Sequence, residues 1–244
     1  MKTIELAASA ICGVLYGVLG YIVYLFTPIT TPGIGIVRFW PVVVIPAVFA
    51  YLFGPLVGGL GAAIGIFISD LLIHGDPLLS LSAGVTANFV GFYILGSISR
   101  RKIDWANIIA ITSAVLMVAF ALIEYVLLTW FSPEAAILFL GLSIASYVIA
   151  VTIGHIYPQW RNYGIASIIG LLVGSTIIGF VVWAYSQVFF LPAAVGGGSK
   201  LPLYAALIWL IWTYATEIPF LVILGPPIIR GCLRAFPGLN PSKE

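Results

Sequence analysis

The chain has 244 residues, of which 62% are hydrophobic and 7% are charged, and its mean hydropathy is +1.18. These values exclude a soluble domain, and a net charge of +2 from ten basic and eight acidic residues excludes a nucleic-acid surface. The sequence therefore predicts a multi-pass protein of the cell membrane, with lipid, other membrane proteins or a small molecule as partners.

The polar breaks divide the chain into helices that can cross a bilayer, each of which needs about 20 mostly apolar residues. The second segment is short and contains Pro41 and Pro46, which predicts an irregular helix. We expect one domain, an all-α polytopic transmembrane helical bundle of six to eight helices, with eight favoured. The eight segments are 4–26, 39–53, 55–73, 80–98, 106–130, 135–157, 164–190 and 202–224.

The distribution of Lys and Arg predicts the orientation. With both termini in the cytoplasm, only Arg38 and Lys200 lie on the outer side, and the other eight basic residues lie inside. This bias agrees with the positive-inside rule. After Leu224, the sequence Gly225-Pro226-Pro227 is expected to end the last helix, which makes 225–244 a cytoplasmic interfacial tail.

The third segment carries small residues at spacings of three and four, which form one stripe along a helix. In hydrocarbon, close packing of small residues is a main source of helix association. We therefore expect this stripe to be a packing interface. Its members are Gly54, Gly58, Ala62, Gly65 and Ser69.

Residues 1–102 resemble the first four helices of the substrate-binding S-component of energy-coupling factor (ECF) transporters, the vitamin-uptake systems. The resemblance rests on the order of its parts: a first helix with small residues in one register, a loose outer loop, the turn FGPLVG, the helix GGLGAAIGIFISDLL, and a fourth helix ending in SRRK. Residues 103–224 form the remaining helices. The family's core has six helices where eight are expected here, so the resemblance does not explain the residues after position 160.

The resemblance implies a subunit that binds a vitamin-like small molecule on the outer face and docks on a transmembrane coupling subunit driven by two cytoplasmic ATPases. We expect no enzymatic activity and no cofactor. The chain has no G-x-x-x-x-G-K-[ST] loop for ATP. The family's docking face carries A-x-x-x-A in the first helix; here Ser9, Gly13 and Gly17 take those positions.

Polar and aromatic residues in the outer half of the bundle are the candidates for substrate binding. Trp side chains can instead form an interfacial belt, Asn88 can instead join two helices, and Asp70 and His74 can satisfy each other, with His74 expected in an exposed loop. The predicted substrate-binding residues are Arg38, Trp40, Asp70, Asn88, Glu124, Trp130, Trp209 and Glu217.

Glu124 and Glu217 are the residues that a structural role explains least well. A carboxylate in a membrane helix costs roughly 2.5 kcal/mol or more, and Arg38 can neutralise only one of Asp70, Glu124 and Glu217. The acidic surplus predicts a substrate with positive charge or several hydrogen-bond donors, held against Trp rings.

Two other classes of function compete with this prediction. The buried glutamates would serve as proton carriers in a stand-alone secondary transporter. Alternatively, the glycine stripe alone matters, and the chain is a structural partner in a larger complex. An enzyme is not expected, because the sequence has no H-E-x-x-H and no G-x-S-x-G motif.

Overall fold

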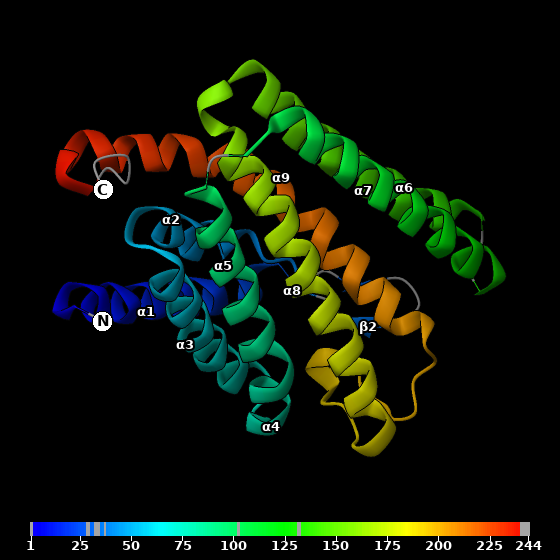
Figure 1. Ribbon diagram of the computed structural model, residues 1–244. Coiled ribbons are helices and arrows are strands. Elements are labelled where there is room, and N and C mark those ends of the chain that lie inside the picture. The colour runs from blue at the N-terminus through cyan, green and yellow to red at the C-terminus, as the bar shows by residue number, and fades with distance from the viewer. Residues whose placement is uncertain are drawn as a thin grey trace.

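A computed structural model of the chain describes residues 2–27, 30–31, 35–36, 38–101, 103–130 and 133–239, with the backbone alone at 30–31, 35–36, 120, 122–128, 130 and 135. The protein is a helical bundle (Figure 1). Its long elements are α1 (Thr3–Phe26), α2 (Val44–Phe53), α3 (Pro55–Ile73), α5 (Thr86–Ser99), α6 (Trp105–Trp130), α7 (Pro133–Ile156), α8 (Arg161–Val188) and α9 (Tyr204–Ala235).

Short elements complete the described chain. A ribbon of two antiparallel strands, β1 (Thr30–Thr31) and β2 (Gly35–Ile36), follows α1. A short helix α4 (Pro77–Leu79) and a π-helical turn η2 (Ser80–Val85) run into α5. The 3₁₀ turns are η1 (Pro41–Val43), η3 (Pro158–Trp160), η4 (Ala193–Val195) and η5 (Pro237–Leu239).

The eight predicted helices are all present, and the prediction of a polytopic membrane bundle is confirmed. Within the described chain, six helices are long and apolar enough to cross a membrane: α1, α3, the continuous helix Pro77–Ser99, α7, α8 and α9. As its prolines predicted, α2 is short and begins in a 3₁₀ turn. Its inner end is closed by Arg100, whose Nη2 donates to the carbonyls of Tyr51 and Leu52.

The helices pack in a chain of neighbours: α1 against α3, α3 against α5, α5 against α8, α8 against α9, and α9 against α7, with α6 outermost on α7. Figure 1 shows α6 and α7 side by side along one flank. Helix α2 fits among α1, α3, α5 and α9. This order brings α3, α5, α8 and α9 around a common interior.

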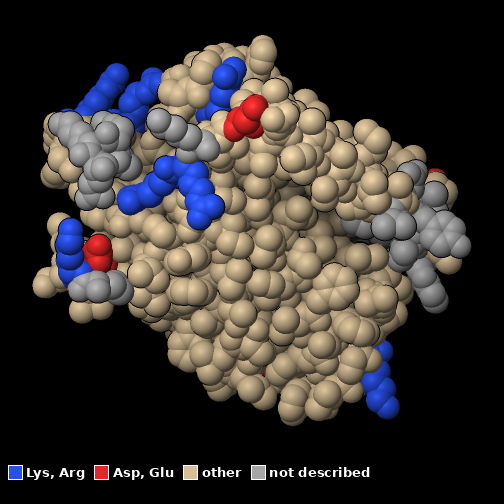
Figure 2. Space-filling view, in the orientation of Figure 1, with Lys and Arg blue, Asp and Glu red and all other residues tan. Residues whose placement is uncertain are grey.

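The two ends of the bundle differ in charge. Figure 1 places the N- and C-terminal ends of the chain at the same end of the bundle, and Figure 2 shows basic side chains gathered there, with few at the opposite end. The loop between α8 and α9, which contains Lys200, lies at that opposite end. The positive-inside rule predicts that the basic end faces the cytoplasm.

The small residues of α3 lie at helix contacts, as the sequence predicted, and they pack against more than one neighbouring helix. A Cβ atom at Gly65 would lie 2.7 Å from the Gly13 carbonyl oxygen of α1, whereas one at Gly58 would meet Ala50 of α2. Ala62 and Ser69 are buried as well, and Gly54 precedes the helix in a positive-φ conformation. The stripe divides because α1 and α2 each cover only part of the length of α3.

The predicted docking face of α1 needs correction. Ser9, Gly13 and Gly17 are buried, and a Cβ atom at Gly17 would lie 2.8 Å from the Gly65 carbonyl oxygen. These small residues therefore let α3 approach α1 within the same chain. In this structure they offer no surface to a second protein.

Helix α9 does not end at Leu224 as expected; it continues through Pro226 and Pro227 to Ala235. Figure 1 shows it changing direction toward its C-terminal end. A proline removes one backbone donor, and neighbouring groups in a membrane protein can satisfy the freed carbonyl. At Pro219 the Ser146 hydroxyl of α7 does so, donating to the Ala215 carbonyl at 2.6 Å.

Candidate functional site

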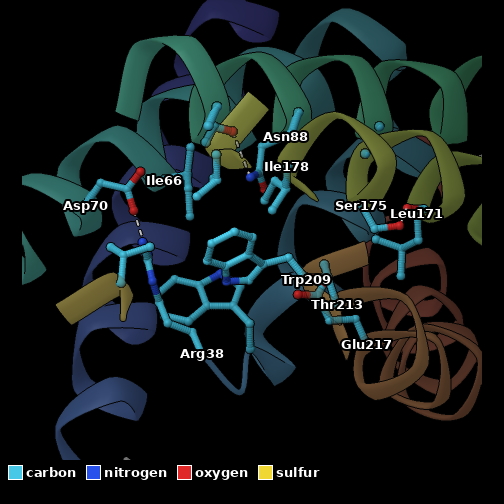
Figure 3. Close-up of a pocket in the computed structure, with 18 of the residues that line it drawn as sticks. Arg38, Ile66, Asp70, Asn88, Leu171, Ser175, Ile178, Trp209, Thr213 and Glu217 are labelled. Atoms are coloured by element: carbon cyan, nitrogen blue, oxygen red, sulfur yellow. Dashed lines mark hydrogen bonds and ion pairs between the residues drawn. The ribbon is translucent and has the colours of Figure 1, made fainter. Parts of the chain in front are cut away.

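A cavity lies beneath the outer loops, where α1, α3, η2, α5, α8 and α9 meet (Figure 3). Residues of η4 and the segment just before η1 lie over its outer side. The volume open to the centre of a water molecule is about 110 Å³. One water needs about 10–15 Å³ by this measure, so the cavity has room for several waters or for part of a small organic ligand.

The structure brings most of the predicted binding residues together around this cavity. Of the three tryptophans predicted to bind substrate, the two whose side chains the structure describes are enclosed by protein, with Trp40 4% and Trp209 3% exposed, so neither belongs to a lipid-facing belt. The side chains of Glu124 and Trp130 lie outside the described part of the chain. The predicted residues that line the cavity are Arg38, Trp40, Asp70, Asn88, Trp209 and Glu217.

An ion pair forms one end of the cavity. Arg38 Nη1 lies 2.6 Å from Asp70 Oδ1, and Ser80 Oγ of η2 donates to Asp70 Oδ2 at 2.7 Å. Gly84, also in η2, allows this arrangement, because a Cβ atom there would lie 2.5 Å from Asp70 Oδ2. Arg38 therefore neutralises Asp70 and ties the outer loop to the end of α3.

His74 is not the exposed loop residue that the sequence suggested. Its side chain is only 1% exposed, and its Nε2 faces Asp70 Oδ1 at 3.7 Å. Its Nδ1 accepts a hydrogen bond from the Asp76 amide, which places the proton of the neutral ring on Nε2. His74 thus extends the Arg38–Asp70 pair toward the turn before α4.

Asp76 joins that turn to α8. Its carboxylate caps α4 by accepting from the amides of Leu78 and Leu79, and the Tyr185 hydroxyl donates to it at 2.7 Å. Burial raises the pKa of Asp76, but the hydrogen bonds from Leu79, Tyr185 and Leu78 outweigh burial and hold the pKa below its ordinary value. Asp76 is therefore a structural carboxylate that fixes the outer ends of three elements.

A hydrogen-bonded chain forms the wall between α1 and α5. Trp40 Nε1 donates to the Tyr16 hydroxyl at 2.9 Å, and this hydroxyl donates to Asn88 Oδ1 at 2.8 Å. Asn88 Nδ2 in turn donates to the Gly84 carbonyl. Asn88 thus joins two helices, as one of the two interpretations of the sequence held, and it also lines the cavity.

The third wall is one face of α9. Trp209, Thr213 and Glu217, each four residues apart, all line the cavity (Figure 3). Glu217 is 7% exposed and makes no hydrogen bond or ion pair with the part of the chain that the structure describes. The sequence predicted this spacing and the lack of a cationic partner for one acidic residue.

Three residues of the site were missed from the sequence. Tyr16 lies on the same face of α1 as Gly13 and Gly20, and in the sequence this pattern indicates only that the face packs against another helix. Ser80 lies in the π-helical turn, and the geometry of that turn decides whether its hydroxyl faces Asp70. Tyr185 lies in α8, and the packing of that helix decides whether its hydroxyl reaches Asp76. No pattern in the sequence specifies either relation.

No protein-family model, curated protein or solved structure matches the chain. The described residues contain no cluster of three or more His, Cys, Asp or Glu side chains placed to hold a metal ion. The class of protein that fold and site define is therefore a multi-pass helical membrane protein with a polar, aromatic-lined cavity beneath its outer loops.

Proposed function

We propose that the chain binds a small solute from the outer side of the membrane and acts as the S-component-like subunit of an ECF-type, ATP-driven uptake transporter. The observation that carries this proposal is the cavity itself. It joins an ion pair, a carboxylate that has no partner among the described residues, and two tryptophans beneath loops on the outer side.

The cost of the polar groups supports a binding role. Charged residues within a membrane bundle each cost at least about 2.5 kcal/mol and usually mark a pathway for a substrate or an ion. The Arg38–Asp70 pair offsets part of that cost, but Glu217 has no such compensation within the described chain. A bound solute would supply it.

The energy source would lie in other subunits, since the sequence contains no ATP-binding loop. A coupling subunit would not bind the small-residue face of α1, which α3 covers. The basic cytoplasmic end of the bundle, which carries Arg101, Arg230 and Arg234, remains available to such a partner.

Glu217 also favours a second candidate, a proton-coupled secondary transporter. It lies thirteen residues into α9, about 20 Å along the helix and thus near the bilayer midplane. Binding sites of secondary transporters lie at that depth. In this alternative Glu217 carries the proton and no ATPase is needed.

Affinity purification from the protein's own host in mild detergents, followed by native mass spectrometry, separates the two candidates. The ECF proposal requires an assembly that contains one further membrane protein and two ATP-binding subunits. If the protein is isolated alone or only with copies of itself across several detergents, the ECF proposal fails. Uptake that follows an imposed proton gradient without ATP would then support the alternative.

A further inference from the structure

The walls of the cavity differ in how well their polar groups are satisfied. On the side of α1, α3 and α5, Asp70 is paired with Arg38 and Ser80, and Tyr16, Trp40 and Asn88 bond to one another. Buried polar groups that already have partners gain little from a ligand. The polar groups on this side of the cavity therefore have partners in the absence of a ligand.

The cavity face of α9 is the opposite case. Thr213 has no hydrogen-bond partner in the described chain, whereas Thr216, on another face, donates to the Trp212 carbonyl at 2.8 Å as helical threonines often do. The indole N–H of Trp209 and the carboxylate of Glu217 likewise bond to no described group. Three unused polar groups therefore share one face of one helix.

We propose that this face of α9 binds the ligand and determines its specificity, and that the ligand is an elongated organic cation. Its ammonium or iminium group would lie at Glu217, a hydrogen-bonding group near Thr213, and a flat apolar part against Trp209. This inference rests on the proposed function, because it assigns the substrate class of the same cavity.

The charge balance of the site supports a cation. Arg38 is held by Asp70 and lies over the Trp40 ring, with its guanidinium carbon 5.4 Å from the ring centre. Arg38 is therefore already paired with a carboxylate, and it offers less to an anionic ligand than a free guanidinium would. Glu217 is the acidic residue of the cavity that lacks an ion-pair partner, and a monocation would neutralise it.

The spacing on α9 supports an elongated ligand. Trp209 and Glu217 are eight residues apart, which corresponds to about 12 Å along a helix, with Thr213 midway. A ligand that uses all three groups carries its charge and its flat part at opposite ends. Its charged end would lie deepest in the membrane, at Glu217.

The test uses purified protein and sets of three probes that differ in charge: tyramine, para-ethylphenol and para-hydroxyphenylpropionate, then tryptamine, ethylindole and indolepropionate. Each probe is titrated while the melting temperature is followed, since a ligand that binds the folded state raises it. We expect the two amines to stabilise the protein more than their uncharged and anionic analogues. Glu217→Gln should weaken amine binding roughly tenfold or more.

Thr213→Val and Thr216→Val form a matched pair, because both remove a hydroxyl from α9 but only Thr213 lines the cavity. Thr213→Val should weaken amine binding, and Thr216→Val should leave it unchanged. Preference for the anions or the uncharged analogues, equal effects of the two Thr variants, or stabilisation by none of the probes would each overturn the inference. None of these outcomes would alter the subunit composition that tests the proposed function.

Discussion

The ion pair between Arg38 and Asp70 gives the most quantitative prediction, because Asp70 is buried and Arg38 is only partly exposed. Arg38 Nη1 and Asp70 Oδ1 are 2.6 Å apart, and the side chains of Arg38 and Asp70 are 19% and 3% exposed. At an effective dielectric constant of about 20, the attraction at this distance is about 6 kcal/mol. Removal of one partner of a buried pair costs about 3–5 kcal/mol, because the other charge stays behind.

We therefore expect Arg38→Met to lower the free energy of unfolding by about 3–5 kcal/mol. Asp70→Asn should cost less, because Arg38 is partly exposed and can turn toward solvent. The double variant should be more stable than the sum of the single effects predicts, with a coupling energy of about 3 kcal/mol.

Unfolding can be followed in mixed micelles by the reaction of a thiol reagent with Cys12, which is fully buried in the folded protein. Both single variants and the double variant are measured against the natural sequence. If the effects of the two substitutions add to within about 0.5 kcal/mol, the pair is not coupled and the account of this end of the cavity is wrong.

Three further substitutions test the packing around the site. Gly13→Leu should destabilise the protein strongly, because its side chain would enter the contact between α1 and α3, and it should lower the melting temperature by several degrees. Ser146→Ala should cost about 1 kcal/mol in the free energy of unfolding, since it leaves the Ala215 carbonyl without its donor. Asp76→Asn should destabilise the protein at neutral pH through the lost charge in the bond with Tyr185. Because the folded protein lowers the pKa of Asp76, this stabilisation is present above the ordinary carboxyl pKa and disappears as the pH falls through the lowered value, so the two melting temperatures should converge in acid.

Each of these substitutions has a control or a contradicting result. Val14→Leu enlarges a residue that is exposed on α1 and should leave the melting temperature unchanged. If Gly13→Leu lowers the melting temperature no more than Val14→Leu does, the packing argument is refuted. Ser143→Ala removes a hydroxyl that bonds only within α7, at Phe139, and should cost less than Ser146→Ala. A constant difference between Asp76→Asn and the natural protein down to low pH would contradict the lowered pKa.

The sequence predicts the helices well because each one depends on local properties: apolar length, proline and glycine positions, and the charge of the loops. The exception is α9: Pro226 and Pro227 predict the end of a helix, but the helix continues to Ala235. Proline is a weaker helix terminator where neighbouring helices or a bend can satisfy the freed carbonyls, and those neighbours are not visible in the sequence.

The site was predictable from charged residues within membrane helices, because such residues are costly there unless they have a partner or a function. Asp70 and Glu217 stood out because charge is costly in a membrane, and both line the cavity. The pairing of Arg38 with Asp70 rather than with Glu217 depends on where the chain places Arg38 relative to α3. The burial of His74 depends on the turn between α3 and α4. Such relations between distant segments are set by packing.

The most direct test of the central claim is whether the cavity holds a small molecule. Native mass spectrometry compares the natural protein with Ile178→Trp, which places a larger side chain into the cavity, after both are purified from the host of origin in mild detergent. Protection of Cys12 from thiol reagents shows that the variant is folded. We predict that the natural protein retains an adduct with the mass of a small organic molecule and that the variant has lost it. If neither protein carries an adduct, or if both carry the same one, the cavity is not the binding site.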